Sequence, residues 1–434
     1  MRKIHQNNTV RYYLLVLVFL AFLFFSGDLG LIDVQKTAIV MAVGIDREED
    51  TFIITSQIAV PQSSKQGQAS ETVQLVSRGK TVADAFEEIN AKTGWYPKLV
   101  FCRLILLGEK TAERDVFDAL DFFLLDEYMS DNCLLATCDG FAKDMLNVTA
   151  LIDPSGSVAM QKVLSSHAER VGTVSPTTLR EFAIGYFSES KSWFLPVLKT
   201  QPQQEQIGTG TGDAAPSPES SQSSFSQSDA SSSSSEQTSE QSSSQTSGES
   251  ADTTAKNASE SKNEDKPVFS AGETALFVEG KRVGKFSENE TFAFNAFKRQ
   301  LRLAVYSVKN GDATCTLTVK RNTPKKKFRL GNDGRVTLQI ELTMSAGLLD
   351  YSKALSVEGG KDMGDVPDDV FSAAEKLLAS QIQQAFEKCR ACDCDLFGVT
   401  EYLQKHQPKR FPAIKAVALE NAILDVSVRF RNVR

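Results

Sequence analysis

The run LVFCRLILL, residues 99–107, is the clearest candidate in this chain for a strand buried in a sheet. It is apolar on both alternating faces apart from Arg103, a pattern that favours a strand covered on two sides. Two β-rich runs precede it, KTAIVMAVGID at 36–46 and TFIITSQIAVP at 51–61, joined by a charged turn at 47–50. Such a pair is typical of a hairpin. These runs together predict a sheet at the centre of this region.

Helical and strand patterns alternate around that sheet. ETVQLVSRGK at 71–80 alternates as a third strand, and Thr81 with Asp84 predicts the start of a helix running to about Lys92. Residues 112–129 place apolar side chains at helical spacing, and residues 132–138 and 193–198 are strand-like. The predicted fold class is therefore α+β with a mixed sheet, in one or two subdomains over residues 29–200.

Residues 201–267 interrupt this pattern with a Ser-rich segment. They contain twenty Ser, and eleven Asp or Glu against three Lys. The segment therefore has a net charge of −8, whereas the whole chain has a net charge of −7. The rest of the chain is close to neutral and carries no basic field of the kind that binds nucleic acid. So polar a segment cannot bury enough apolar surface to offset the entropy of ordering. We predict a disordered linker with ends roughly 45 Å apart; a tail that binds cell-wall polymer is the alternative.

A second α+β domain is predicted over residues 268–434. ETALFVEGKRVGKFS at 273–287 reads as a hairpin that turns at Glu279–Gly280. The longest helix is expected at 365–389, with Pro367 in its first turn and its apolar residues on one face. Further strands are expected at about 302–308, 313–320, 335–344 and 422–430.

The N-terminal run YYLLVLVFLAFLFF, residues 12–25, is predicted to enter a membrane. Arg2, Lys3 and Arg11 precede it, which favours a cytoplasmic N-terminus and a main body on the far side. Fourteen residues are short for a span of about 20, but Phe24 and Phe25 occupy the positions where a cleavage site needs small residues. We therefore expect an uncleaved anchor over residues 1–28, with a cleaved signal or a buried core helix as alternatives. The predicted anchor residues are Tyr12, Leu14, Leu15, Val16, Leu17, Val18, Phe19, Leu20, Phe22, Leu23, Phe24 and Phe25.

The cysteines and histidines do not form a recognisable catalytic or metal motif. Cys389, Cys392 and Cys394 lie close together in CRACDC, but a structural zinc site needs a fourth ligand, and the only His downstream is His406. We predict no metal and no cofactor. In an oxidising compartment Cys389 and Cys392 could cross-link. His167 and His406 are expected to be solvated surface residues.

Two other classes of function remain open from the residues alone. Asp121, Asp126 and Glu127 could supply the carboxylates of a cell-envelope hydrolase, although acidic residues on an exposed helix face explain them equally well. An extracytoplasmic solute-binding protein would need a cleft between two similar lobes, and the two halves share no repeat. The basic run 325–327 is expected to be a solvated turn, with a contact to anionic headgroups as the alternative.

Several blocks resemble the Ger(x)C family in their order and spacing. Before the Ser-rich segment they are AIVMAVGID at 38–46, SRGKTVADAFEEIN at 77–90, LVFCRLILLGE at 99–109, ALDFFLLDEY at 119–128 and AKDML at 142–146. After it they are ETALFVEGKRVGKFSENET at 273–291, DCDLFGVTEYL at 393–403 and the closing strand.

The resemblance implies a C subunit of a spore germinant receptor. Such a subunit is not an enzyme; it lies on the outer face of the spore inner membrane beside a membrane-spanning A subunit and a transporter-like B subunit. Two departures stand out: the family is usually anchored by a lipidated Cys, whereas the first Cys here is Cys102, and it usually lacks so long an insertion. The two halves are therefore expected to move more independently. No residue pattern identifies a nutrient site.

Turn and cap residues within these blocks are the candidates for shaping the molecule or contacting partners. Turn chemistry explains them more simply than direct partner contact does. The candidate residues are Gly44, Asp46, Glu109, Asp126, Asp393 and Phe397.

Overall fold

The structure is a computed structural model. It describes residues 11–20, 37–59, 72–148, 153, 155–165, 168–201, 268–298, 301–311, 313–331, 335–352 and 365–433. Residues 11–20 are helical, and no helix among the described residues combines the length and apolar character of a membrane span. The anchor residues Phe22–Phe25, His167 and nearly all of the Ser-rich segment lie outside the described residues.

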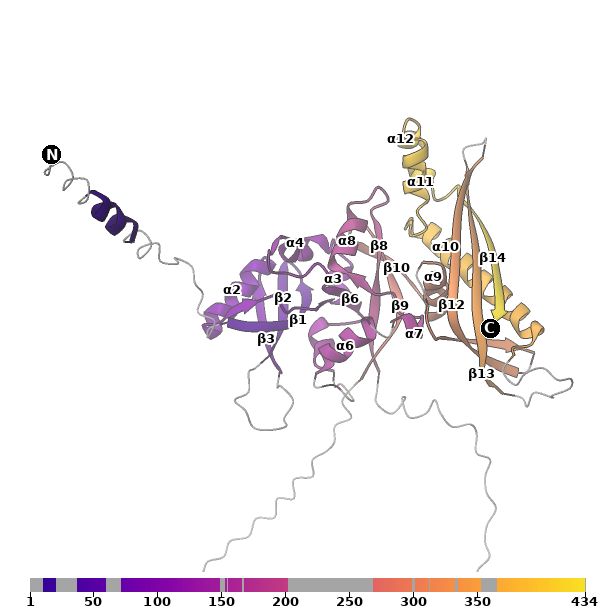
Figure 1. The fold of residues 1–434 in the computed structure, drawn as a ribbon, viewed down its shortest axis with the longest axis horizontal. Coiled ribbons are helices and arrows are strands. Elements are labelled where there is room, and N and C mark those ends of the chain that lie inside the picture. The colour runs from indigo at the N-terminus through magenta and orange to yellow at the C-terminus, as the bar shows by residue number, and fades with distance from the viewer. Residues whose placement is uncertain are drawn as a thin grey trace, which may run out of the picture. The chain divides into compact units, whose positions relative to one another are not determined.

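A large sheet organises the first half of the chain, with the strand order β10-β9-β8-β6-β5-β1-β2-β3 (Figure 1). Its centre is parallel, because β1, β5, β6 and β8 run in the same direction, while β2 and β3 on one side and β9 and β10 on the other are antiparallel. The main strands are β1 (Thr37–Glu48), β2 (Thr51–Ala59), β3 (Thr72–Gly79), β5 (Leu104–Leu107), β6 (Leu134–Cys138), β8 (Ser192–Gln201), β9 (Val268–Val278) and β10 (Lys281–Phe286). The short strands β4 (Tyr96–Lys98) and β7 (Thr177–Thr178) pair with β1 and β6.

Helices cover both faces of this sheet, as the doubly apolar pattern of β5 predicts. Ile105 and Leu107 pack into one core with α2 (Val82–Thr93), α4 (Phe117–Leu125) and α8 (Leu179–Tyr186). Leu104 and Leu106 face the other core, with α5 (Ala142–Leu146) and α6 (Gly156–Leu164). All four side chains are fully buried.

Two predicted elements differ from the structure in their bounds. The strand expected at 99–107 is only four residues long, because residues 99–102 form a turn closed by the Cys102 N–H donating to Leu99 O at 2.8 Å. The helix expected at 112–129 is broken into α3 (Glu109–Ala112) and α4. The chain leaves the helical path between them, where Phe117 N–H is capped by the carboxylate of Asp115.

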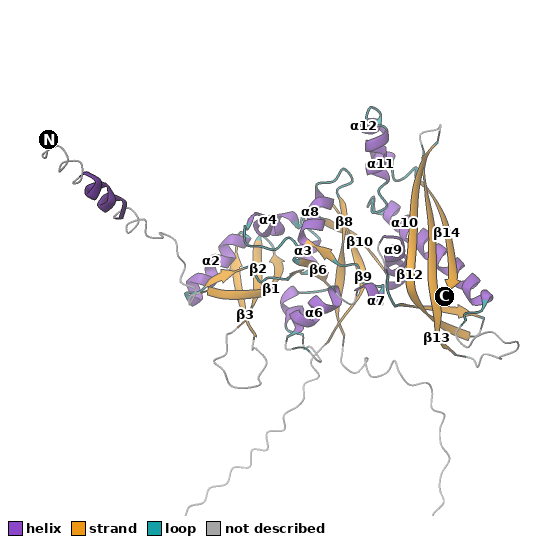
Figure 2. Ribbon diagram, in the orientation of Figure 1, coloured by secondary structure: helices purple, strands orange, loops and turns teal. Residues whose placement is uncertain are grey.

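A four-stranded sheet organises the second half, in the order β11-β12-β13-β14. Figure 2 shows α10 (Asp368–Ala391) lying along this sheet, and its apolar face packs in the same core as α9 (Glu288–Lys298). The predicted long helix is thus confirmed, whereas α9 was not predicted. The strands are β11 (Ala304–Asn310), β12 (Ala313–Leu330), β13 (Val336–Tyr351) and β14 (Ile423–Asn432), and the remaining helices are α7 (Ala168–Val171), α11 (Val399–His406) and α12 (Phe411–Ile414).

The segments on either side of the Ser-rich insertion are neighbours in one sheet. β8 and β9 pair antiparallel, and Gln201 lies opposite Val268 at the end of the ladder. The expected separation of roughly 45 Å between the ends of the insertion is therefore wrong, because strand pairing brings them together. The hairpin predicted at 273–287 is confirmed, with β9 and β10 pairing in the sheet of the first half. The described residues of 37–201 and 268–433 accordingly form one compact unit.

Replacing residues 202–266 with a four-residue Gly-Ser turn is expected to leave the fold intact. Because Gln201 and Val268 are already partners, a short turn can close the hairpin, and the smaller loop should raise the free energy of unfolding by roughly 2 kcal/mol. Urea titration of both proteins checks this. A less stable or insoluble variant would show that the insertion itself supports folding.

Candidate functional site

The carboxyl ends of β1, β5 and β6 meet at one edge of the large sheet because these strands are parallel. Asp46, near the end of β1, is only 3% exposed. Its two carboxylate oxygens accept the N–H groups of Ala142 at 2.8 Å and Lys143 at 3.0 Å, the first residues of α5. Burial raises the pKa of Asp46 above its ordinary value, and these two hydrogen bonds oppose the rise. Asp46 thus fastens α5 to the sheet from nearly a hundred residues away.

Two glycines allow this close approach. A Cβ on Gly108 would lie 2.0 Å from Oδ1 of Asp46, and one on Gly44 would lie 2.9 Å from Leu146 of α5. Neither distance is compatible with an ordinary side chain. Gly44 and Asp46 are therefore placed together by the structure, with Gly108 as a third member that sequence reasoning missed.

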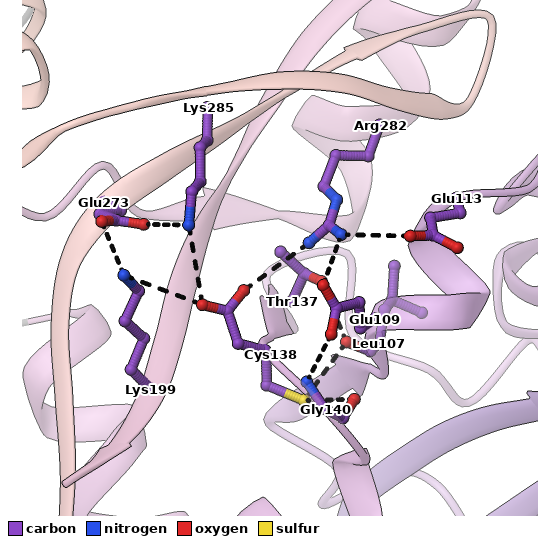
Figure 3. Close-up of polar contacts among 11 residues, drawn as sticks. Leu107, Glu109, Glu113, Thr137, Cys138, Gly140, Lys199, Glu273, Arg282 and Lys285 are labelled. Atoms are coloured by element: carbon purple, nitrogen blue, oxygen red, sulfur yellow. Dashed lines mark hydrogen bonds and ion pairs between the residues drawn. The ribbon is translucent and has the colours of Figure 1, made fainter.

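An ionic network continues along the same edge (Figure 3). Arg282 of β10 donates to Oε1 of Glu109 at 2.9 Å, and its guanidinium lies 3.7 Å from Glu113 and 3.8 Å from Asp139. The other oxygen of Glu109 accepts the Gly140 N–H at 3.1 Å. The hydrogen bond from Arg282, followed by that from Gly140, lowers the pKa of Glu109. A strand that follows the insertion is thus tied to α3 and to the loop after β6, which precede it.

Glu273 of β9 forms the second half of this network. It lies 2.7 Å from Nζ of Lys199 on β8 and 2.9 Å from Nζ of Lys285 on β10, and both lysines lie 3.8 Å from Asp139. Burial of Glu273 opposes ionisation, but the two lysines lower its pKa below the ordinary value. Three cations thus face four carboxylates within the group, and each cation contacts at least two carboxylates, as expected of a structural junction. We call these residues the carboxyl-edge network: Glu109, Glu113, Asp139, Lys199, Glu273, Arg282 and Lys285.

Arg282→Gln is expected to lower the free energy of unfolding by about 1–3 kcal/mol, because it leaves three carboxylates facing one another with Glu109 partly enclosed. The loss of stability should be smaller in high salt, because salt screens the repulsion between the more exposed carboxylates. Urea titration measures it. Arg180→Gln is the matched control: Arg180 pairs with Asp131 at 3.6 Å on the surface and should matter little. Equal effects of both variants would contradict a junction at Arg282.

A second junction is built by the loop between α10 and α11. The Asp395 N–H donates to Ser192 Oγ at 3.0 Å, and its carboxylate accepts the N–H groups of Gly398 at 2.8 Å and Thr400 at 2.6 Å, which caps α11. Glu401 accepts the Ser190 hydroxyl at 2.6 Å. The loop from α10 to α11 therefore fastens to the strand β8 and the turn before it.

Two of the predicted residues lie in this loop. Phe397 is fully buried, with its ring centroid 4.9 Å from that of Phe297 and 5.1 Å from that of Phe386. Asp393 adopts a positive φ of 52°, which turns the chain out of α10. Lys326 as a residue is exposed, but its Nζ donates to the carbonyl of Phe397, and burial of the amine, together with the charge of Lys298, lowers its pKa to about 8.

The remaining candidates lie apart from these junctions. Asp126 ends α4 and accepts the Tyr128 N–H at 2.8 Å, and Asp121 lies exposed on the same helix. His406 is exposed and stacks on Tyr402. The seven cysteines are free thiols, and in the described part of the chain no three His, Cys, Asp or Glu side chains converge as metal ligands.

Sequence reasoning found Glu109 but missed its partners. Arg282 and Lys285 are three residues apart on β10, so simple alternation would place them on opposite faces of the strand. The register shift between Arg282 and Gly284 lets both reach Asp139, and the sequence carries no signal for it. Asp139 and Lys199 could not be matched to residues of β9 and β10, because the pairing of β8 with β9 across the insertion is not visible in the sequence.

Two family models match the chain on either side of the insertion. "Spore germination protein N-terminal domain" matches residues 31–200, and "Spore germination B3/ GerAC like, C-terminal" matches residues 272–431. Spore germination protein A3 of Bacillus subtilis (strain 168) is 26% identical over 187 residues, which are 41% of this chain and 49% of that protein. The chain thus matches this curated relative over about half of the relative's length.

A crystal structure of the GerBC protein is similar at 14% identity with a TM-score of 0.48, over 90% of this chain and 97% of that one. The two family models together cover most of the chain, in their expected order, and their matches meet in the large sheet at β8 and β9. The chain belongs to the Ger(x)C family of spore germination proteins.

Proposed function

We propose that this chain is a non-enzymatic, membrane-tethered C subunit of a spore germinant receptor, required for nutrient-triggered germination. It would act by assembling with membrane-spanning A and B subunits. The observation that carries the proposal is the match of both family models, in order, on the two sides of the insertion.

The geometry supports a scaffold in which the two family-matched regions are held firmly against each other. The β8–β9 ladder, the carboxyl-edge network and the 393–401 loop connect the two matched regions. The charged side chains of these junctions are directed at one another or at backbone groups, an arrangement that stabilises a fold. A scaffold of this kind can present several surfaces to partners at once.

The N-terminal apolar run supports a tether in the spore inner membrane, with the N-terminus cytoplasmic and the main body outside. A tether raises the effective concentration of the folded part near its membrane partners, so that weak contacts suffice for assembly. Two membrane-spanning partner subunits, rather than nucleic acid or a soluble enzyme, fit that placement.

Deleting the gene in its spore-forming host tests the proposal. Spores of the deletion strain are exposed to single nutrients, and dipicolinate release is followed. Loss of the response to one nutrient is expected, with restoration when the full chain is supplied in trans. A nutrient-independent trigger serves as the control and should still release dipicolinate.

Two results would contradict the receptor role. One is an intact response to every nutrient in a strain from which the other germinant receptors have also been removed. The other is loss of the nutrient-independent response, which would indicate a general defect in the spore envelope.

A further inference from the structure

The amino ends of β1, β5 and β6 meet at the edge of the sheet opposite to the carboxyl-edge network, because the three strands are parallel. The chain enters this edge at Thr37, the first residue of β1, after the apolar N-terminal run. The loop before β5 and the loop before β6 lie at the same edge. We call it the amino edge.

Apolar side chains are exposed at this edge instead of charged networks. The segment from Trp95 into β4 and the turn before β5 contribute four of them, and the end of α4 with its following loop contributes two. Their exposed fractions range from 42% to 83%. The amino-edge patch consists of Trp95, Tyr96, Val100, Phe101, Leu125 and Tyr128.

Backbone pairing and a cation–π contact connect the two parts of the patch. Tyr96 lies opposite Thr37 in the β4–β1 pair. Nζ of Lys98 lies 4.9 Å from the ring centroid of Tyr128, which joins the β4 segment to the loop before β6. The Leu134 N–H donates to Arg103 O at 2.9 Å, so the two loops run side by side into the sheet.

Single exposed apolar residues are ordinary on protein surfaces, but six of them gathered at one edge of a sheet point to a contact surface. The composition indicates which kind. Trp and Tyr combine an apolar ring with a polar group, and they are enriched where a membrane meets water. The charges nearby, Lys98 and Arg103 against Asp126 and Glu127, are of both signs and favour neither an acidic nor a basic partner.

We propose that the amino-edge patch rests in the interfacial layer of the lipid bilayer that holds the N-terminal run; this rests on the proposed tethering. Thr37 follows Phe25 by twelve positions in the chain, so the connection reaches at most about 40 Å when fully extended. One member of the patch, Tyr96, lies directly opposite Thr37, where that connection joins the fold. A weakly inserting surface is held at the bilayer by this tether.

Intrinsic fluorescence can test the contact, because the chain has only two tryptophans, Trp95 and Trp193. Trp193 is partly buried against Phe194 with Lys298 above its ring. The full chain with Trp193→Phe is reconstituted in phosphatidylcholine nanodiscs, with and without phosphatidylglycerol. Lipids brominated near the top of the acyl chain then act as quenchers from the membrane, and iodide acts as the quencher from water.

The expected result is loss of Trp95 emission with brominated lipid and weak quenching by iodide, in both lipid compositions. The reciprocal Trp95→Phe chain, which retains Trp193, should show no loss with brominated lipid. The double substitution Val100→Ser with Phe101→Ser should weaken membrane contact, so that iodide quenches Trp95 emission strongly. The matched control is Ile184→Ser with Phe187→Ser, which alters exposed apolar residues in α8 and just after it. This control should leave iodide quenching of Trp95 weak.

Trp95 that is open to iodide and insensitive to brominated lipid, in chains that co-purify with nanodiscs, would overturn the proposal. Shielding from iodide without lipid quenching, seen only in spore membranes that contain the partner subunits, would also overturn it and assign the patch to a protein contact. The deletion assay is independent of both results. Normal germination without the chain, combined with lipid quenching, would reject the receptor role and leave the membrane contact standing.

Discussion

Phe397→Ala is expected to lower the free energy of unfolding by about 3–5 kcal/mol, the range for a fully buried phenylalanine. The ring lies between Phe297 of α9 and Phe386 of α10, and its removal leaves a cavity where the loop meets both helices. The loop also carries Asp395, which binds Ser192. The substitution should therefore weaken the connection between the two family-matched regions as well as the local core.

Urea titration of the full chain, followed by circular dichroism, measures the loss. Phe187→Ala is the matched control, because Phe187 is 70% exposed and its removal should change stability by less than about 1 kcal/mol. If Phe397→Leu restores most of the stability, volume is the cause, since leucine refills part of the cavity. A Phe397→Ala chain as stable as the Phe187→Ala chain would contradict the assignment of this residue to the junction.

Asp46→Ala is expected to lower the free energy of unfolding by about 2–4 kcal/mol, because it leaves the buried N–H of Ala142 and the partly buried N–H of Lys143 without an acceptor. Helix α5 should loosen from the sheet first, and faster amide exchange at these two positions would report it. Asp126→Ala is the control, since Asp126 caps one N–H at the surface and should cost less. Slow amide exchange at Ala142 in the Asp46→Ala chain would contradict the prediction.

The effect of Asp46 should also depend on pH. Its folded-state pKa is raised, with burial as the largest cause. A raised pKa means that the folded state holds the proton more tightly than the unfolded state. The stabilisation is therefore full at low pH and falls as pH rises through the folded-state pKa. The difference in stability between the wild type and Asp46→Ala should be larger at about pH 4 than at about pH 7.

Local patterns in the sequence were sufficient for most of the elements. Alternation in residues 36–61 predicts the hairpin that the structure forms as β1 and β2, and the apolar face of 365–389 predicts α10. The capping box of Thr81 and Asp84 is formed as expected. These features depend on residues within a few positions of one another, so they can be recognised in the sequence before any long-range contact is known.

The order of strands was decided by tertiary structure. Nothing local distinguishes a hairpin at 273–287 that begins a new domain from one that completes an earlier sheet, and only packing placed it beside β8. The same holds for Asp46, whose role as a cap for α5 requires two groups nearly a hundred residues apart to meet. Arg282 likewise acquires its partners from α3 and the loop after β6.

The sequence by itself determined the α+β class, the Ser-rich insertion, the apolar N-terminal run and the family resemblance, because composition, periodicity and block order are properties of the chain. Tertiary structure alone decided that the insertion lies between two paired strands, and that charges before and after it form one network. The physical reason is that strand pairing and ion pairing are long-range contacts. Their partners are selected by the burial of the whole sheet and carry no mark in the local sequence.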